Sequence, residues 1–292
     1  MTGSGGTLEA VVSVMGKDAM EPGFAASEID TSRPHPARMY DAYLGGRDNY
    51  PVDREAVQQI LRDFPEVRLI ALANRAFLHR AVRFLAAEAG IRQFLDIGTG
   101  IPSAGNVHEV AGQVTPDARV VYVDNDPIVH VHASALLTGS GTTSIVLADL
   151  RDPSVILAHP GLRAMIDFTR PVALLLVAIL HFVTDEEDPG GIVATLLDAL
   201  PAGSYLALSH ATADFHSPGA LGRATAVYKN ATAPFVPRPF KQVVGFFDGV
   251  ELVEPGLVQA PQWRPEGRRP RPRDLGKIGI YAGLGRKALA SS

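Results

Sequence analysis

An acid and two glycines at the end of one apolar segment have the clearest chemical signature in this chain. Asp96, Gly98 and Gly100 lie within or just after the mostly apolar segment 93–97, with Thr99 between the glycines. Glycines at a strand-to-helix turn let the backbone approach a nucleotide-like ligand and expose N–H groups at a helix N-terminus. The pattern predicts such a ligand here, although an ordinary turn with a helix-capping acid has the same residues.

Acids also follow the next two apolar segments. Asp124 and Asn125 come at the end of one segment, and Asp149 and Leu150 come at the end of the other. An acid at the first place can bind both hydroxyls of a ribose. A carboxylate at the second can accept a hydrogen bond from an adenine amino group. Each acid taken alone is explained as well by a turn or a helix cap.

These residues need elements that bring them together, and the chain supplies alternating strands and helices. Strands are predicted at 93–97, 119–123, 144–147, 172–179, 204–210, 250–254 and 277–284. Helical spacing is found at 104–113, 128–137, 153–159, 190–200, 219–230 and 239–247. Such alternation predicts an α/β fold with a mainly parallel sheet covered on both faces, and ligands of such sheets bind at the carboxyl ends of the strands. A loop without a helix separates the last two strands, which favours an antiparallel pair.

The segments before the first strand have a different composition. Residues 1–29 are rich in Gly, Ser and Ala and are expected to be disordered. The polar stretch 31–49 is expected to be irregular, whereas 53–63 and 68–89 have helical apolar spacing. We therefore predict an N-terminal helical lid at 30–90 that covers the strand ends of a domain at 91–292.

The predicted lid carries polar and aromatic side chains suited to a ligand. Arg47 and Arg75 are candidates to pair with a ligand carboxylate, because a guanidinium offers a fork of donors that fits this group. Tyr43 is a candidate for contact with a substrate. The alternative is a surface loop whose polar residues make structural hydrogen bonds.

Residues of the second half are further candidates. His181 follows the fourth predicted strand and can act as a general base, or it can simply shape the ligand pocket. His210 ends the fifth predicted strand and is a candidate for substrate contact. Trp263, together with Phe235 and Phe240, is a candidate to line an acceptor pocket. An aromatic residue in such a place belongs to the core more often than to a pocket.

Composition excludes several other classes. Without cysteine, the chain has no disulfide, thiolate zinc site or cysteine nucleophile. The net charge of −4 argues against a nucleic-acid partner. The longest apolar run, 172–180, is shorter than the roughly 20 residues of a membrane span, so a cytoplasmic protein without a membrane partner is expected.

His130 and His132 do not share a helix face, and no metal site is predicted.

Taken in order, the three acid motifs resemble those of class I S-adenosylmethionine-dependent methyltransferases over about 92–286. The resemblance implies a Rossmann-like, doubly wound, seven-stranded sheet with an antiparallel last hairpin, and S-adenosylmethionine as the cofactor. It also implies that Gly98 and Gly100 approach the methionine part, Asp124 the ribose and Asp149 the adenine. Pro102 stands where many members of the class have a further glycine.

A narrower resemblance includes the N-terminal segments. The stretches 33–50, 73–83 and 96–102, together with 255–258 and 263–265, are similar to an actinobacterial group of methyltransferases formerly treated as a domain of unknown function. The expected function is direct in-line methyl transfer to a small-molecule acceptor, in which the protein mainly orients the reactants and excludes water. The resemblance identifies no acceptor, and the sequence predicts no oligomeric state.

Two alternatives remain at this point. One is an NAD-dependent dehydrogenase, against which stand Ser103 at the third glycine position of the dinucleotide fingerprint and an acid, Asp96, before the first glycine. The other is a non-catalytic regulatory protein that binds S-adenosylmethionine.

Overall fold

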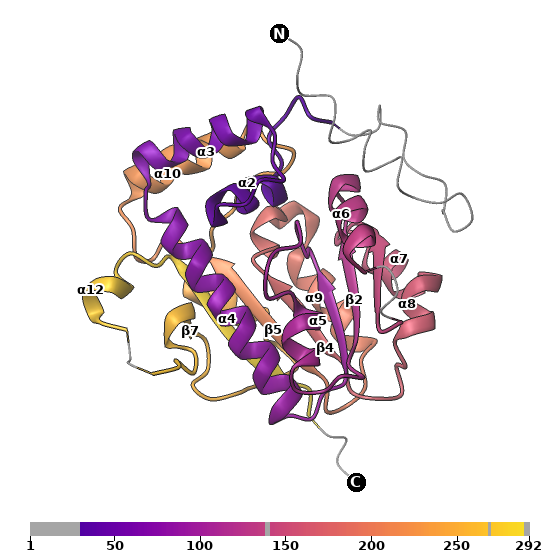
Figure 1. The fold of residues 1–292 in the computed structure, drawn as a ribbon. Helices are drawn as coiled ribbons and strands as arrows, with labels where there is room; N and C mark the ends of the chain where they lie inside the picture. Colours follow the sequence, from indigo (N-terminus) through magenta and orange to yellow (C-terminus); the bar gives the residue numbers. More distant parts are fainter. Residues whose placement is uncertain (1–29, 138–140, 268–269, 289–292) are drawn as a thin grey trace. The chain divides into compact units, whose positions relative to one another are not determined.

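An eight-stranded mixed sheet carries the fold (Figure 1). The computed structural model describes residues 30–137, 141–267 and 270–288, so the prediction of disorder at 1–29 lies outside the described residues. The strands are β1 (Gln93–Ile97), β2 (Arg119–Asp124), β3 (Thr143–Leu147), β4 (Ala173–Val177), β5 (Tyr205–Ala211), β6 (Glu251–Leu252), β7 (Val258–Gln259) and β8 (Ile280–Arg286).

The strand order is β3-β2-β1-β4-β5-β8-β6, with β7 also paired to β8. Strands β1 to β5 pair in parallel, and β8 is antiparallel to β5, β6 and β7. This confirms the predicted mainly parallel Rossmann-like sheet with an antiparallel end. The predicted number of seven strands is wrong by one, because the two-residue strand β7 forms where a loop was expected. So short a strand has no detectable alternation of its own.

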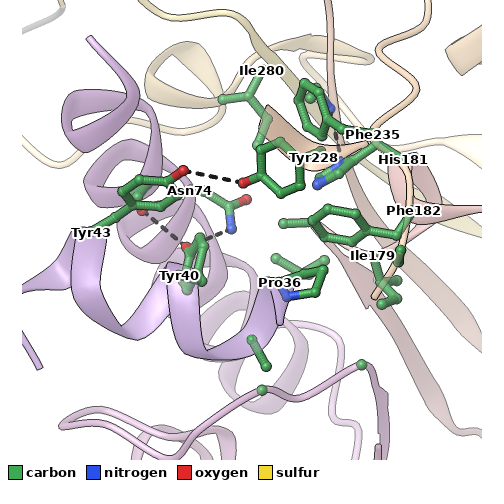
Figure 2. Close-up of a pocket in the computed structure, with 18 of the residues that line it drawn as sticks. Pro36, Tyr40, Tyr43, Asn74, Ile179, His181, Phe182, Tyr228, Phe235 and Ile280 are labelled. Atoms are coloured by element: carbon green, nitrogen blue, oxygen red, sulfur yellow. Dashed lines mark hydrogen bonds between the residues drawn. The ribbon is translucent and has the colours of Figure 1, made fainter. Parts of the chain in front are cut away.

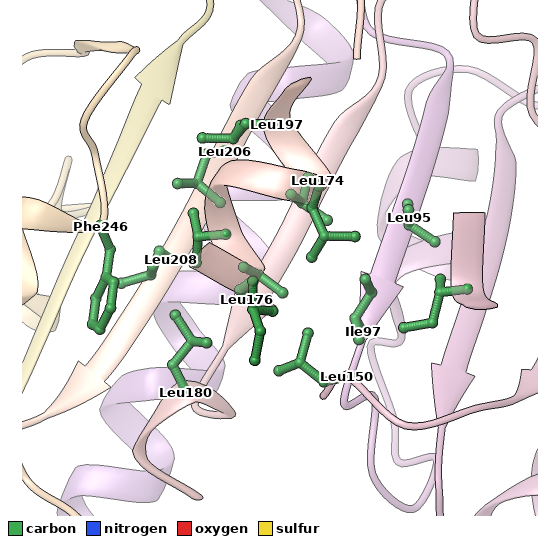
Figure 3. Close-up of a cluster of buried hydrophobic side chains, with 14 of the residues drawn as sticks. Leu95, Ile97, Leu150, Leu174, Leu176, Leu180, Leu197, Leu206, Leu208 and Phe246 are labelled. Carbon is green, nitrogen blue, oxygen red and sulfur yellow. The ribbon is translucent and has the colours of Figure 1, made fainter. Parts of the chain in front are cut away.

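Apolar alternation along the strands divides the core into two layers. Leu95 and Ile97 of β1 face one layer, and Phe94 faces the other, as the period of two in a strand requires. Figure 3 shows the first layer, which includes residues of β4 and β5. Its helices are α7 (Pro153–Ala158), α8 (Pro160–Met165), α9 (Pro189–Asp198) and α11 (Phe240–Gly245). The second layer is covered by α4 (Val67–Ala87) and α5 (Val107–Gly112).

A third apolar cluster lies outside the sheet layers. It joins α2 (Pro36–Leu44), α3 (Pro51–Asp63), the start of α4 and α10 (Pro218–Tyr228). We call these four segments the cap. Figure 1 shows α10 beside α3 although they are far apart in the sequence, and an ion pair of 3.2 Å joins Arg223 of α10 to Asp63 of α3. The cap therefore includes a segment that lies far outside residues 30–90.

Helix α2 forms where the sequence predicts irregular structure. His35 accepts a hydrogen bond from the Ala37 N–H, Pro36 occupies the first turn, and Gly45 ends the helix with φ of 84°. These are helix start and stop signals. They outweigh the polar composition of the segment, which obscured its apolar face. Helix α8 was also not predicted, and α6 (Pro127–Leu137) and α12 (Pro272–Leu275) complete the α-helices of the described residues. None of the helices in these residues has the length and hydropathy of a membrane span.

Candidate functional site

A cavity of about 240 Å³ lies at the carboxyl ends of the parallel strands, beneath the cap. Residues after β1, β2, β3, β4 and β5 line it, together with residues of α2, α3, α4 and α10. Of the predicted site residues, those that line it are Tyr43, Arg75, Asp96, Gly98, Thr99, Gly100, Asp124, Asn125, Asp149, Leu150, His181 and Phe235. Arg47, His210, Phe240 and Trp263 do not line it.

The turn after β1 depends on its two glycines. Gly98 has φ of +73° and Gly100 has φ of +66°, a region that other residues rarely adopt. A Cβ on Gly98 would lie 2.4 Å from Cγ1 of Ile179, so this glycine allows close contact with the segment after β4. A Cβ on Gly100 would meet only Ala37, at 3.9 Å. The backbone at Gly100 therefore borders open space in the cavity.

Two buried carboxylates stand beside this turn. Asp124 accepts hydrogen bonds from the Gly100 N–H at 2.8 Å and the Asp126 N–H at 2.9 Å. Asp96 accepts one from Oγ1 of Thr99 at 3.3 Å. Burial raises the pKa of Asp124 to about 6 and that of Asp96 to about 7. Both carboxyls therefore change charge close to neutral pH.

Asp149 is held in place by its neighbours. Its Oδ2 accepts hydrogen bonds from Nδ2 of Asn125 at 2.8 Å and Nη1 of Arg151 at 2.9 Å. Arg151 also forms an ion pair of 2.8 Å with Glu187. The carboxylate is about one-third exposed and lines the cavity, so it keeps acceptor capacity for a ligand.

Of the two candidate arginines, the structure places one at the cavity. Nη2 of Arg75 donates to the carbonyl oxygens of Ser103 at 3.3 Å and Ala104 at 3.2 Å. Its Nε is buried and has no hydrogen-bond partner. Arg47 is exposed and does not line the cavity, because it follows the end of α2 in a surface loop.

His181 lies at the wall of the cavity beyond β4. Its Nδ1 accepts a hydrogen bond from the Ala211 N–H at 3.3 Å, and its ring contacts Phe182 and Phe235 with centroids 4.5 Å and 5.2 Å away. Burial, with a further contribution from His210, holds the pKa of His181 well below its usual value. The side chain is therefore neutral at physiological pH. Because Nδ1 accepts, the ring hydrogen belongs on Nε2.

Two other candidates, His210 and Trp263, do not line the cavity. His210 is fully buried; its Nδ1 donates to the Ala211 carbonyl at 2.7 Å, and its Nε2 accepts from Arg238 at 3.1 Å. Trp263 is fully buried in the sheet core, where its ring meets Phe77 edge-on at 5.5 Å. These placements give both residues a structural position and no direct contact with a cavity ligand.

Several lining residues were not singled out from the sequence. Tyr40 accepts a hydrogen bond from Nδ2 of Asn74 at 2.9 Å, and the hydroxyls of Tyr43 and Tyr228 are 3.2 Å apart (Figure 2). Tyr228 follows the fifth strand by many residues, and only the packing of α10 against α3 brings it over the cavity. Phe235, a candidate from the sequence, lines the cavity, whereas Phe240, another candidate, does not. A helix face with Ala224 and Tyr228 four positions apart was the one available signal.

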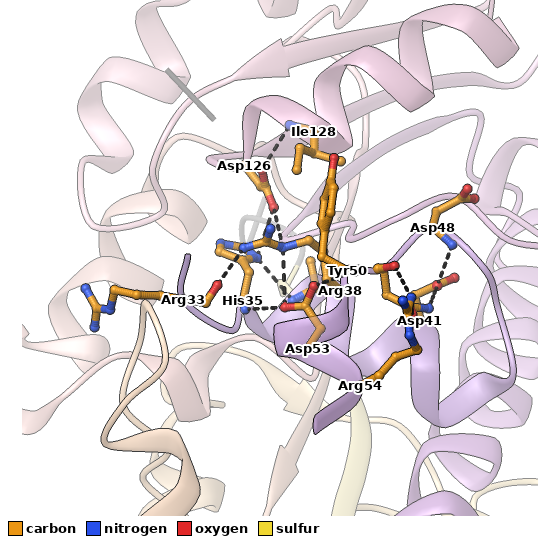
Figure 4. A network of polar contacts seen from close by, with 12 residues as sticks. Arg33, His35, Arg38, Asp41, Asp48, Tyr50, Asp53, Arg54, Asp126 and Ile128 are labelled. Atoms are coloured by element: carbon orange, nitrogen blue, oxygen red, sulfur yellow. Dashed lines mark hydrogen bonds and ion pairs between the residues drawn. The ribbon is translucent and has the colours of Figure 1, made fainter. Parts of the chain in front are cut away.

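A polar network fixes the cap beside the Asp124 turn (Figure 4). Nδ1 of His35 lies 3.1 Å from Oδ2 of Asp126, which also accepts from the Ile128 N–H through Oδ1. Nε of the buried Arg38 is 3.6 Å from Asp53 of α3, and Asp53 accepts from the His35 N–H at 2.9 Å. Burial lowers the pKa of His35, so the charged contact between cap and sheet is that of Arg38 with Asp126, whose Nε and Oδ2 are 3.9 Å apart beside the turn after β2.

Comparison with known proteins identifies the family. The sequence model of the S-adenosyl methyltransferases matches residues 22–288. The chain belongs to the S-adenosyl methyltransferase family. This confirms the predicted S-adenosylmethionine-dependent enzyme and its cofactor. No curated protein matches the chain.

Solved structures similar to this methyltransferase agree with that family. A DUF574 family protein from Streptomyces avermitilis is 48% identical, with a TM-score of 0.85, over 88% of this chain and 99% of that one. A candidate methyltransferase from Thermobifida fusca is 43% identical, with a TM-score of 0.82, over 89% and 97% of the two chains. An O-methyltransferase family protein from Burkholderia thailandensis shares the fold, with a TM-score of 0.51 at 14% identity over 77% and 59% of the chains.

Proposed function

We propose that this methyltransferase transfers the methyl group directly to a small molecule held beneath the cap. The observation that carries the proposal is the continuity of the cavity. The same space is lined by the acid-and-glycine turns after β1 to β3 and by the aromatic side chains around His181. A cofactor on the first side and an acceptor on the second would then meet without leaving the cavity.

The lining residues fit S-adenosylmethionine. The unpartnered Nε of Arg75 suits the carboxylate of the methionine part. We assign Gly98, Thr99 and Gly100, with Asp96, to the same part of the cofactor. We assign Asp124 and Asn125 to the ribose, and Asp149 and Leu150 to the adenine, because they succeed one another along β1, β2 and β3. Arg47 is left out of this assignment because of its distance from the cavity.

The chain's own contribution is orientation and the exclusion of water. The bound cofactor supplies a methyl group on a sulfonium, which an acceptor lone pair attacks while the S–C electron pair returns to sulfur. Gly98 and Asp124 would hold the cofactor at the strand ends, and the cap would cover it. The proton of the acceptor atom then passes to water.

His181 is better placed as a hydrogen-bond donor than as a general base. Its Nδ1 already accepts from the Ala211 N–H, so the Nε2 hydrogen faces away from that bond. Proton uptake at Nε2 would require the ring hydrogen to move to Nδ1 and the bond to Ala211 to break. We propose that His181 positions the acceptor, and Tyr43 is a second candidate for contact with it.

Calorimetric titration of the purified protein with S-adenosylmethionine, S-adenosylhomocysteine and NAD, side by side, tests the cofactor site. Micromolar binding of the first two and no binding of NAD are expected. Arg75→Gln should weaken the binding of S-adenosylhomocysteine, whereas Arg47→Gln should leave it unchanged. Binding of NAD alone would contradict the proposal, and equal effects of the two arginine variants would contradict the role of Arg75.

A further inference from the structure

The sheet order divides the cavity into two sides. Strand β4 separates β1, β2 and β3 from β5 and β8. The residues assigned to the cofactor follow β1, β2 and β3. On the other side of β4, the cavity is lined by side chains of the cap and of the segments after β4 and α10. We call this side the acceptor chamber; its walls include Tyr40, Tyr43, Phe182, Tyr228, Phe235 and Ile280 (Figure 2).

Charge is unevenly distributed between the two sides. Among the described lining residues, the Asp and Arg side chains are Asp96, Asp124, Asp149, Arg75 and Arg151, and Glu and Lys are absent. Asp96, Asp124, Asp149 and Arg151 come at the ends of β1 to β3, and Arg75 binds the loop after β1. None is among the walls named above: Arg151, whose Nη2 lies 3.5 Å from the Phe182 carbonyl oxygen, is paired with Asp149 and Glu187. Burial lowers the pKa of both His181 and His216, which also line the cavity, so both rings are neutral. A charged ligand group would lose its hydration there and gain no ion pair, which is costly.

Aromatic rings form one wall of the chamber. The rings of Tyr228 and Phe235 are stacked, with centroids 5.0 Å apart and planes at 23°. Phe182 lies 5.9 Å from Tyr228 and 6.1 Å from Phe235. Tyr40 and Tyr43 approach from the opposite side in Figure 2. Walls of this kind favour a flat ring, because an aromatic ligand gains stacked and edge-on contacts in addition to apolar burial.

Two of the hydrogen-bonding groups in the chamber are neutral hydroxyls, and Asn74, His181 and His216 also line the cavity. The hydroxyls of Tyr43 and Tyr228 bond to each other at 3.2 Å, and each keeps further donor or acceptor capacity. Burial raises the pKa of Tyr43 well above its usual value and that of Tyr228 to about 12, so both stay protonated. They suit an uncharged polar substituent on a ligand.

We infer that the acceptor is an uncharged, flat aromatic compound whose hydroxyl or amino group is methylated, bound in the acceptor chamber between the Phe182–Tyr228–Phe235 wall and Tyr40 and Tyr43 of α2. This inference rests on the proposed function. In the reaction, the lone pair of that oxygen or nitrogen forms the new bond to carbon, the S–C bond breaks towards sulfur, and the proton of the substituent passes to water.

The test compares three probes on the complete protein saturated with S-adenosylhomocysteine. They are 2-naphthol, which is neutral and flat; 2-naphthoate, which is flat but charged; and 1-decanol, which is neutral but not flat. Calorimetry is expected to show binding of 2-naphthol at least ten-fold tighter than that of the other two. Equal or tighter binding of 2-naphthoate or 1-decanol would overturn the inference.

Variants locate the binding in the chamber. Phe235→Leu and, separately, Phe182→Leu remove a ring while keeping apolar bulk, and each should weaken 2-naphthol binding about 3–10-fold. Binding of S-adenosylhomocysteine should change less than two-fold. Phe240→Leu is the matched control, since Phe240 is exposed and does not line the cavity. Unchanged 2-naphthol binding in both wall variants, with folding intact by circular dichroism, would overturn the inference.

The two proposals fail in different ways. If S-adenosylhomocysteine does not bind, the proposed cofactor site is wrong. If it binds and the protein shows no preference for the neutral aromatic probe, only the assignment of the acceptor class is wrong.

Discussion

At the scale of single residues, Asp124 links the chemistry of the site to pH. It is a buried carboxyl whose two oxygens accept backbone N–H groups on opposite sides, at Gly100 and Asp126. These bonds favour the charged form, and burial disfavours it more strongly, which leaves the pKa at about 6. Protonation removes acceptor capacity from the group. If Asp124 accepts the ribose hydroxyls, as proposed, binding of the cofactor competes with protonation.

The affinity for S-adenosylhomocysteine should rise with pH through this interval. Protonation of free Asp124 below a pKa of about 6 should weaken binding about ten-fold between pH 7.5 and pH 5. In the free protein the same raised pKa makes the free energy of unfolding fall as pH rises from about 4 towards 6, because the folded state holds the proton more tightly. Calorimetry at several pH values measures the binding.

Asp124→Asn provides the comparison for that measurement. It should weaken binding at pH 7.5 by about 1–3 kcal/mol, the cost of unmatched polar partners, and reduce the pH dependence. Asp248→Asn is the control, since Asp248 is exposed and lies outside the cavity. A wild-type affinity that stays constant from pH 5 to 7.5 would contradict the assignment of Asp124.

His181 allows a second prediction at this scale. If it donates a hydrogen bond from Nε2, His181→Gln should retain kcat within about ten-fold, whereas His181→Leu should lose more. Loss of a general base would cost about 10²–10⁴-fold in both variants. Rates with an aromatic acceptor over pH 6–9 distinguish the two roles. A loss of 100-fold or more in His181→Gln, together with a changed pH profile, would establish a base.

At the scale of elements, Arg238 connects the segment after β4 to the end of β5. Its guanidinium donates to the carbonyl oxygens of Leu180 at 3.0 Å and Val183 at 2.8 Å, and to Oδ1 of Asp185 at 2.6 Å. It also donates to Nε2 of His210 at 3.1 Å. His210 thus supports the segment that carries His181, a role that its position at the end of a strand could not distinguish from substrate contact.

Replacing Arg238 with methionine should destabilise the protein. The change keeps the apolar stem but removes charged hydrogen bonds to a largely buried segment, at an expected cost of about 2–4 kcal/mol in the free energy of unfolding. Arg271→Met is the matched control: Arg271 pairs with Asp274 on the surface, and its loss should cost less than about 1 kcal/mol. Urea unfolding measures both, and equal values would argue against the role of Arg238.

The helices and strands also show how much of the fold and of the candidate site could be predicted from the sequence. The five parallel strands were placed to within about a residue at most ends, because they are apolar on both faces and bounded by helices. The same regular alternation of strands and helices predicted that the acids at the ends of β1, β2 and β3 lie at one edge of the sheet. Phe235 was among the aromatic residues that the sequence offered for an acceptor pocket, and it lines the cavity. Tyr228 was missed, because its place over the cavity depends on α10 packing against α3, a long-range contact that a single sequence does not show.

At the scale of the whole molecule, helix α4 belongs to two cores. Ala71 packs in the cap cluster, whereas Phe77, Ala81 and Leu85 pack on the sheet. The cap also contacts the sheet through Arg38 and Asp126, with Nε and Oδ2 3.9 Å apart. A continuous helix shared by two cores should prevent one from unfolding without the other. The cavity is lined by residues of both, so a ligand bound there should strengthen this coupling.

Cap and sheet should therefore unfold in one cooperative transition. The single tryptophan, Trp263, is fully buried in the sheet core, and its fluorescence reports on that core. Hydrogen exchange of the α2 and α3 amides reports on the cap. Both probes should give the same free energy of unfolding, and S-adenosylhomocysteine at 100 times its Kd should raise both by about 2.7 kcal/mol. A different result would contradict this prediction: amides of the cap exchange with a free energy much lower than that of the sheet in the free protein, and the two values become equal only with ligand bound. The cap would then close only on binding.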